Sequence, residues 1–170
     1  MVRILLTVVL VGLTLGVVPA GADMNIKPAS SAGLEPLKFL IGKWEGKAPD
    51  GKVVRVTYEL TSGGSVLEET LVKDKEPSMK TLYHVDGNRL MLTHYCSLGN
   101  QPRMAADMPQ GEFKKLQFAF VDASNLATPK DPHMHQLTFN VQDRDHITQD
   151  WVLSKDGQDM THTFTLQRKK

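Results

Sequence analysis

Apolar and polar residues alternate along most of the chain after residue 42, a pattern typical of β-strands that bury one face. The alternation recurs in short segments at close spacing, and each segment is long enough for one strand. The segments that carry it are 54–60, 66–72, 79–85, 89–96, 104–108, 116–120, 135–141, 147–153 and 160–166. With a first strand directly after Gly42, they predict about ten strands.

Short turn sequences stand between these segments. They are Asp50-Gly51, Gly63-Gly64, Asp86-Gly87, Asp143-Arg144-Asp145 and Asp156-Gly157. Links this short join antiparallel neighbours, because a parallel crossover needs about a dozen residues. One longer link, 122–132, has room for a single helical turn. We therefore predict an all-β fold, a single antiparallel up-and-down barrel of about ten strands, in preference to a sandwich.

The segment before the strands has a different character. Arg3 precedes a 15-residue apolar run, 4–18, and small residues follow at 20–22. This order predicts a secretory signal peptide over 1–22. A membrane anchor is disfavoured because a spanning helix needs about 20 apolar residues. Residues 23–33 are then a flexible leader and 34–170 the barrel domain, which begins with a short helical plug at 34–41. We expect a periplasmic or secreted protein without a membrane span after cleavage.

Charge and cysteine content narrow the functional classes. The chain has 20 Lys and Arg and 19 Asp and Glu, so loss of Arg3 with the signal peptide leaves 19 of each sign. This balance gives no basic surface for nucleic acid. The single cysteine, Cys96, excludes an intramolecular disulfide and is either a small buried residue or a reactive thiol. The sequence indicates no particular oligomeric state.

Residues 37–46 (LKFLIGKWEG) resemble the Gly-x-Trp start of calycin, or lipocalin-like, barrels. The resemblance implies that Trp44 closes one end of the barrel beneath the plug. It also implies that Gly42 lets the chain pass tightly from the plug into the first strand. Arg168, or another residue of the last strands, would then stack over the indole.

Three other stretches, 83–104, 133–135 and the strand around Trp151, are similar to a family of small exported bacterial calycin-like proteins of unknown function. That resemblance covers nearly the whole chain after the signal peptide. It implies a fold and a periplasmic setting but no reaction. A more distant resemblance is to nitrobindin-like barrels, which bind haem through a histidine near the C-terminus. It implies His162 as the corresponding residue.

Histidines on apolar strand faces are the main candidates for chemistry. Since side chains alternate along a strand, His94, His135 and His162 each share a face with large apolar residues. We expect all three to be shielded from solvent and to point toward a common interior. His133 and His135, two residues apart, are also able to offer two ligands to one metal. The alternative is that each imidazole only hydrogen-bonds a core partner, for which Gln149, Tyr58 and Tyr83 are the candidates.

Three further positions complete the sequence-based site. Tyr58 and Trp151 lie on apolar strand faces and are expected to line a ligand site. Arg103 ends the turn 99–103, where a guanidinium on a barrel rim suits a carboxylate. The turn amides have an equally good structural explanation, which is that they satisfy backbone groups. Glu69 also lies on an apolar face and is either an interior carboxylate or a solvent-facing one.

The predicted function is the binding of a small, mostly apolar molecule inside the barrel. The chain contains no H-E-x-x-H, C-x-x-C or G-x-S-x-G motif, so no catalytic residue is assigned and binding is favoured over catalysis. Two alternatives stay open: a haem- or metal-binding barrel, and a filled barrel that acts on a partner protein through its outer surface. Cofactor and metal are left unassigned. The predicted ligand-binding residues are His94, His135, His162, Tyr58, Trp151 and Arg103, with Gly42 and Trp44 structural.

The exported form is expected to begin at Asp23, because the small residues at 20–22 suit a signal peptidase. Intact-mass measurement of protein from the periplasm or medium tests this. A mass that retains residues 1–22 would contradict the signal-peptide prediction.

Overall fold

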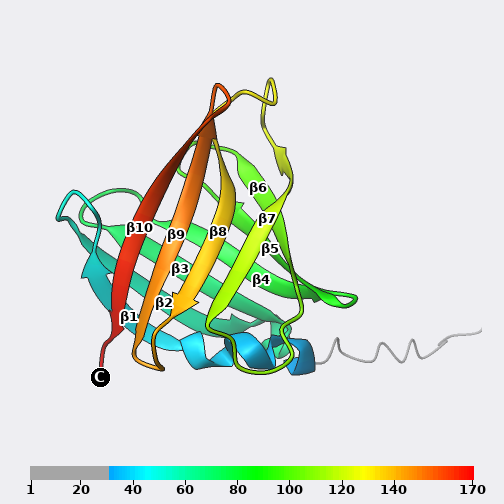
Figure 1. The fold of residues 1–170 in the computed structure, drawn as a ribbon, viewed down its shortest axis with the longest axis vertical. Coiled ribbons are helices and arrows are strands. Elements are labelled where there is room, and N and C mark those ends of the chain that lie inside the picture. The colour runs from blue at the N-terminus through cyan, green and yellow to red at the C-terminus, as the bar shows by residue number, and fades with distance from the viewer. Residues whose placement is uncertain (1–30) are drawn as a thin grey trace, which may run out of the picture.

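The computed structural model describes residues 31–170, which form one closed antiparallel barrel of ten strands (Figure 1). Each strand pairs with its neighbours in sequence, and β1 pairs with β10 to close the barrel. The predicted all-β up-and-down barrel with a helical plug is thereby confirmed. The predicted signal peptide, 1–22, and leader residues 23–30 lie outside the described residues. Within 31–170, no helix combines the length and apolarity needed to cross a membrane.

The elements follow one another with short links. The longest link between strands is 125–132, shorter than the predicted 122–132, and it contains turns without a helix. The elements are η1 (Ser31–Leu40), β1 (Gly42–Lys47), β2 (Val53–Thr61), η2 (Ser62–Gly64), β3 (Val66–Lys73), β4 (Met79–Asp86), β5 (Arg89–Tyr95), β6 (Gln101–Asp107), β7 (Lys115–Ser124), β8 (His133–Val141), β9 (His146–Lys155) and β10 (Gln158–Arg168).

The 3-10 helix η1 lies across one end of the barrel, which we call the plug end (Figure 1). It starts three residues before the predicted plug. Gly33 packs so closely on β4 that an added Cβ would lie 2.5 Å from a methyl group of Val85. Leu34, Leu37 and Leu40 are fully buried, so the helix turns its apolar side toward the core. Each buried leucine contributes about 1.5–3 kcal/mol of hydrophobic stabilisation.

The opposite end, which we call the distal end, carries the loops 48–52, 74–78, 96–100 and 125–132 and the turn at 156–157. Between the two ends, the rings of Tyr83, Phe118 and Phe139 contact one another with centroids 5.7–6.4 Å apart. The largest fully buried side chains are those of Trp44, Trp151, Tyr58, Tyr83, Phe118, Phe139, Leu34, Leu37, Leu40, Leu67, Leu90 and Leu92. Most of them fill the middle of the barrel and the plug end.

Trp44 occupies the position that the sequence predicted. Its indole is 1% exposed, and its Nε1 donates a hydrogen bond of 2.7 Å to the carbonyl of Leu40 in η1. The guanidinium carbon of Arg168 lies 4.3 Å from the centre of the ring, which is the expected cation–π contact. Arg168 also donates to the carbonyls of Phe39 and Ile41. The last strand therefore holds the plug and the first strand together.

Two glycines make this arrangement sterically possible. Gly42 has a φ of +123°, which side-chain-bearing residues rarely adopt, and it joins η1 to β1. At Gly46, an added Cβ would lie 1.7 Å from the carbonyl oxygen of Thr165 on β10. The barrel closes at β1 and β10 because position 46 has no side chain.

We expect Trp44→Ala to lower the free energy of unfolding by about 3–5 kcal/mol, because it leaves a cavity under the plug and removes the surface on which Arg168 stacks. Thermal and urea unfolding measure the loss. Arg103→Ala is the control, since it removes only an exposed ion pair worth about 0–1 kcal/mol. Unfolding of Trp44→Ala at nearly the wild-type temperature would contradict this account of the plug end.

Candidate functional site

Polar side chains occupy one row inside the barrel. Tyr58 pairs with Glu69, Glu69 with Thr81, and Thr81 with His94, so the four residues share one face of β2, β3, β4 and β5. All four are buried, with exposed fractions of 3% or less. Glu69 is therefore an interior carboxylate, which settles the choice that the sequence left open. Buried polar groups in such a row require hydrogen-bond partners.

Glu69 is the centre of a hydrogen-bond network. Its Oε2 accepts from the hydroxyl of Tyr83 at 2.7 Å and from Nε2 of Gln149 at 3.0 Å. The same Gln149 amide donates to the hydroxyl of Tyr58, and its Oε1 accepts from the indole of Trp151 at 3.2 Å. β2, β3, β4 and β9 are thus connected across the barrel interior.

The second carboxylate oxygen of Glu69, Oε1, is buried without a hydrogen-bond partner. Among the buried residues of the described chain there is no lysine or arginine to pair with it. Burial raises the pKa of Glu69 to about 6, and hydrogen bonds from Tyr83, Tyr58 and Gln149 limit the rise. Glu69 therefore changes charge close to neutral pH.

His94 is the second unusual group in this row. Its Nδ1 is 2.9 Å from the hydroxyl of Thr81, and its ring lies 4.6 Å from the indole of Trp151. Burial lowers the pKa of His94 to about 4, so the imidazole is neutral at pH 7. Its Nε2 is buried and has no partner. The core partner of His94 is Thr81, whereas Tyr83 and Gln149 donate to Glu69 and Tyr58 accepts from Gln149.

His133 and His135 lie together at the distal end, where β8 starts. Nε2 of His133 is 3.2 Å from Nδ1 of His135, and both rings lie 4.8 Å from Phe120. Nδ1 of His133 lies 2.7 Å from the backbone carbonyl of Asp131. A register shift between Met134 and Gln136 marks a bulge at this point of β8. His133 is 4% exposed and His135 is half-buried.

His162 on β10 is half-buried and pairs with Trp151 on β9, so the two side chains share a face. Of the three histidines that the sequence placed on apolar faces, His94 is 3% exposed, and His135 and His162 are half-buried. The indole next to His162 is already in contact with His94.

Arg103 lies away from the interior. It belongs to β6 rather than to a rim turn, and its guanidinium forms a two-pronged ion pair with Asp122 on the outer face of β7. The turn amides also make contacts: Gln101 accepts from Ser124 and Asn125, and Asn100 donates to the carbonyl of Pro132, while Oδ1 of Asn100 is buried without a partner. The turn 99–103 is thus held by its own contacts, which matches its structural explanation.

Cys96 also has a structural role. Its side chain is buried, and burial raises the pKa of the thiol, so it stays protonated at neutral pH. Residues 31–170 contain no group of three or more His, Cys, Asp or Glu side chains placed to hold a metal ion.

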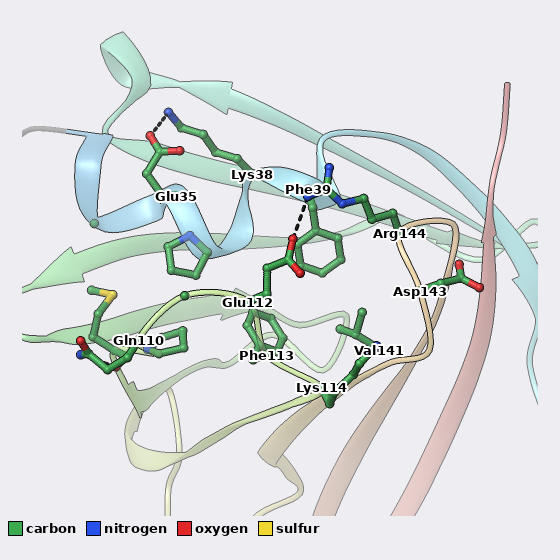
Figure 2. A pocket seen from close by; sticks show the side chains of 15 residues that line it. Glu35, Lys38, Phe39, Gln110, Glu112, Phe113, Lys114, Val141, Asp143 and Arg144 are labelled. Carbon is green, nitrogen blue, oxygen red and sulfur yellow. Dashed lines mark hydrogen bonds and ion pairs between the residues drawn. The ribbon is translucent and has the colours of Figure 1, made fainter.

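A groove of about 950 Å³ lies outside the barrel at the plug end (Figure 2). The rings of Phe39 and Phe113 meet edge to face at 5.8 Å, and Arg144 pairs with Glu112 at 2.7 Å across its rim. None of the histidines lines it. The lining residues are Gly33, Glu35, Pro36, Lys38, Phe39, Met108, Pro109, Gln110, Gly111, Glu112, Phe113, Lys114, Val141, Asp143 and Arg144. The sequence pattern did not indicate this groove, because the fold brings its walls together from η1, the end of β8 and the loops on either side of β7 and β8.

The fold and the interior polar row define the class: a closed ten-stranded antiparallel barrel with a buried, unpaired carboxylate. No protein-family model matches the chain, and no curated protein is significantly similar to it. Among solved structures, a protein of unknown function from the DUF3598 family of Nostoc punctiforme is similar, with a TM-score of 0.46 and 13% identity over 78% of this chain. The match spans 49% of that protein's chain. The fold assignment rests on the strand pairing described above.

Glu69 and His94 are expected to make opposite contributions to stability as pH changes. Because the pKa of Glu69 rises from 4.5 to about 6 on folding, stability falls by about 2 kcal/mol as pH rises through that window. Because the pKa of His94 falls from 6.5 to about 4, stability increases by about 3 kcal/mol as pH rises through its window. The free energy of unfolding in urea, measured between pH 4 and 7, gives the sum of the two contributions.

In Glu69→Gln the free energy of unfolding is therefore expected to increase more steeply with pH than in wild type. In His94→Gln it is expected to decrease as pH rises. Each variant is compared with wild type at every pH, so that a constant destabilisation cancels. Profiles of Glu69→Gln and wild type that run parallel would contradict the burial of an ionisable Glu69.

Proposed function

We propose that this protein is an exported, calycin-like barrel that binds a small, mostly apolar molecule in the distal half of its interior. The observation that carries the proposal is that two buried polar atoms of the interior row, Oε1 of Glu69 and Nε2 of His94, have no hydrogen-bond partner. A buried polar atom without a partner costs about 1–3 kcal/mol, so a ligand that satisfies either of them gains that energy on binding.

The positions of the two atoms suit one bound molecule. Glu69 and His94 lie in the same row on β3 and β5, whose backbones are about 10 Å apart because β4 lies between them. The surrounding walls are apolar and aromatic, with Trp151 against His94. A compact molecule with a single hydrogen-bonding group fits this combination better than a strongly charged one.

Access is proposed from the distal end. There Met134 on β8 and Leu153 on β9 are only half-buried, and Met160 on β10 is 59% exposed. Leu153 pairs with both Met134 and Met160, so these apolar residues span three neighbouring strands. A mostly apolar molecule would replace water on this surface.

N-Phenyl-1-naphthylamine tests the proposal, since it is neutral and apolar and has a single N–H donor. We expect a saturable rise in its fluorescence with one molecule bound per chain. In Glu69→Gln, the amide oxygen still accepts the hydrogen bonds from Tyr83 and Gln149. The amide N–H₂ then takes the place of Oε1, so a donor faces the N–H of the probe where an acceptor stood before. The affinity is expected to fall at least about tenfold.

Phe113→Ser in the outer groove is the matched control and is expected to bind the probe as wild type does. Loss of binding in Phe113→Ser with no effect of Glu69→Gln would place the ligand outside the barrel and contradict the proposal. The absence of any saturable binding, with no small molecule extracted from protein purified from its natural source, would do so as well.

A further inference from the structure

We propose that Nε2 of His133 and Nδ1 of His135 together bind one divalent transition-metal ion, copper(II) most tightly, at the distal end of the barrel. This site is separate from the interior pair, Glu69 and His94, and goes beyond the binding of an apolar molecule. It uses residues from one short stretch of β8 and the loop before it.

The spacing of the two nitrogens fits a shared ion. They are 3.2 Å apart. Two imidazole nitrogens that bind one ion at 2.0–2.1 Å lie about 3.3 Å apart at the tetrahedral angle of zinc and about 2.9 Å apart at the right angle that copper(II) prefers. The separation in the metal-free pair lies between these two values, so a small rotation of His135 brings the nitrogens to the spacing for copper(II).

The hydrogen bonding of His133 prepares its Nε2 as a ligand. Its Nδ1 lies 2.7 Å from the carbonyl oxygen of Asp131, which only accepts, so Nδ1 carries the proton. Nε2 is therefore the unprotonated nitrogen, and its lone pair points toward His135. A backbone carbonyl behind the ligating histidine is the usual way in which proteins fix the tautomer and orientation of a metal ligand.

His135 supplies the second nitrogen and the access route. In the metal-free pair its Nδ1–H donates to His133; when a metal binds, that proton moves to Nε2 of the same ring and Nδ1 becomes the ligand. No net proton is released by this change of tautomer. Phe120 contacts both rings at 4.8 Å and limits their rotation. His135 is only half-buried, so an ion reaches the pair from the distal end.

Two protein ligands leave coordination positions for water or an external ligand. No further His, Cys, Asp or Glu of residues 31–170 completes a group of three around this pair. Imidazole ligands suit copper, zinc and nickel, and copper(II) is the most tightly held of the divalent ions. The site is therefore expected to bind copper(II) more tightly than zinc(II).

Copper(II) titration of the purified chain, followed by electron paramagnetic resonance, tests the proposal. We expect one tightly bound ion per chain with hyperfine structure from two nitrogens. His133→Gln and His135→Gln are each expected to weaken binding at least about tenfold, because each removes one ligand. His162→Gln, a half-buried histidine at the same end of the barrel, and His146→Gln, an exposed one beside Asp143, are the matched controls.

Near-ultraviolet circular dichroism establishes that each variant is folded. If His133→Gln does not fold, the half-buried His135→Gln decides the question alone. Copper(II) affinity that is unchanged in His135→Gln, or that falls equally in His146→Gln, would overturn the proposal. A spectrum with a single nitrogen ligand in the wild-type chain would also overturn it.

Discussion

The guanidinium of Arg168 connects three parts of the chain that are far apart in sequence. It lies over the indole of Trp44, donates to two carbonyls at the end of η1, and forms an ion pair with Asp145 in the β8–β9 turn. Arginine suits this position because its planar group stacks on a ring while its edge donates several hydrogen bonds. The plug, the first strand and the last strand are thereby fixed relative to one another. Everything described inside the barrel depends on this closure, because it separates the interior from water.

The interior divides into regions with different tasks. Near the plug, leucines and aromatic rings fill the space and supply hydrophobic stabilisation. In the middle, the network around Glu69 ties four strands together through hydrogen bonds. Burial favours the neutral form of both Glu69 and His94, which raises the pKa of the carboxyl group and lowers that of the imidazole. Toward the distal end the packing becomes looser and the histidines gather. Stability is concentrated at one end, and the groups available for binding are concentrated at the other.

The sequence predicted the strands and their inward faces well, because alternation is a local property of the chain. It placed Trp44 under the plug and His94 inside the barrel. It did not predict the partner of His94, because the register that brings Thr81 beside it depends on pairing between strands. Arg103 is a similar case: a register shift between Arg103 and Met104 accompanies its contact with Asp122, and no turn motif reveals such a bulge. The two-residue spacing of His133 and His135 predicted that they lie close together. It did not predict the hydrogen bond that orients His133 on the carbonyl of Asp131.

The absence of a side chain at Gly46 lets β1 pair with β10, and this pairing also removes the free edges of the sheet. An open ten-stranded sheet has two edges whose N–H and C=O groups are free to pair with another molecule, which is how edge strands lead to aggregation. In this barrel β1 and β10 use those groups on each other, so the sheet has no free edge. One missing methyl group therefore protects the protein from polymerising through its own strands. A larger residue at position 46 would leave the edges of β1 and β10 unpaired and open to other strands, even if every other contact in the core were kept.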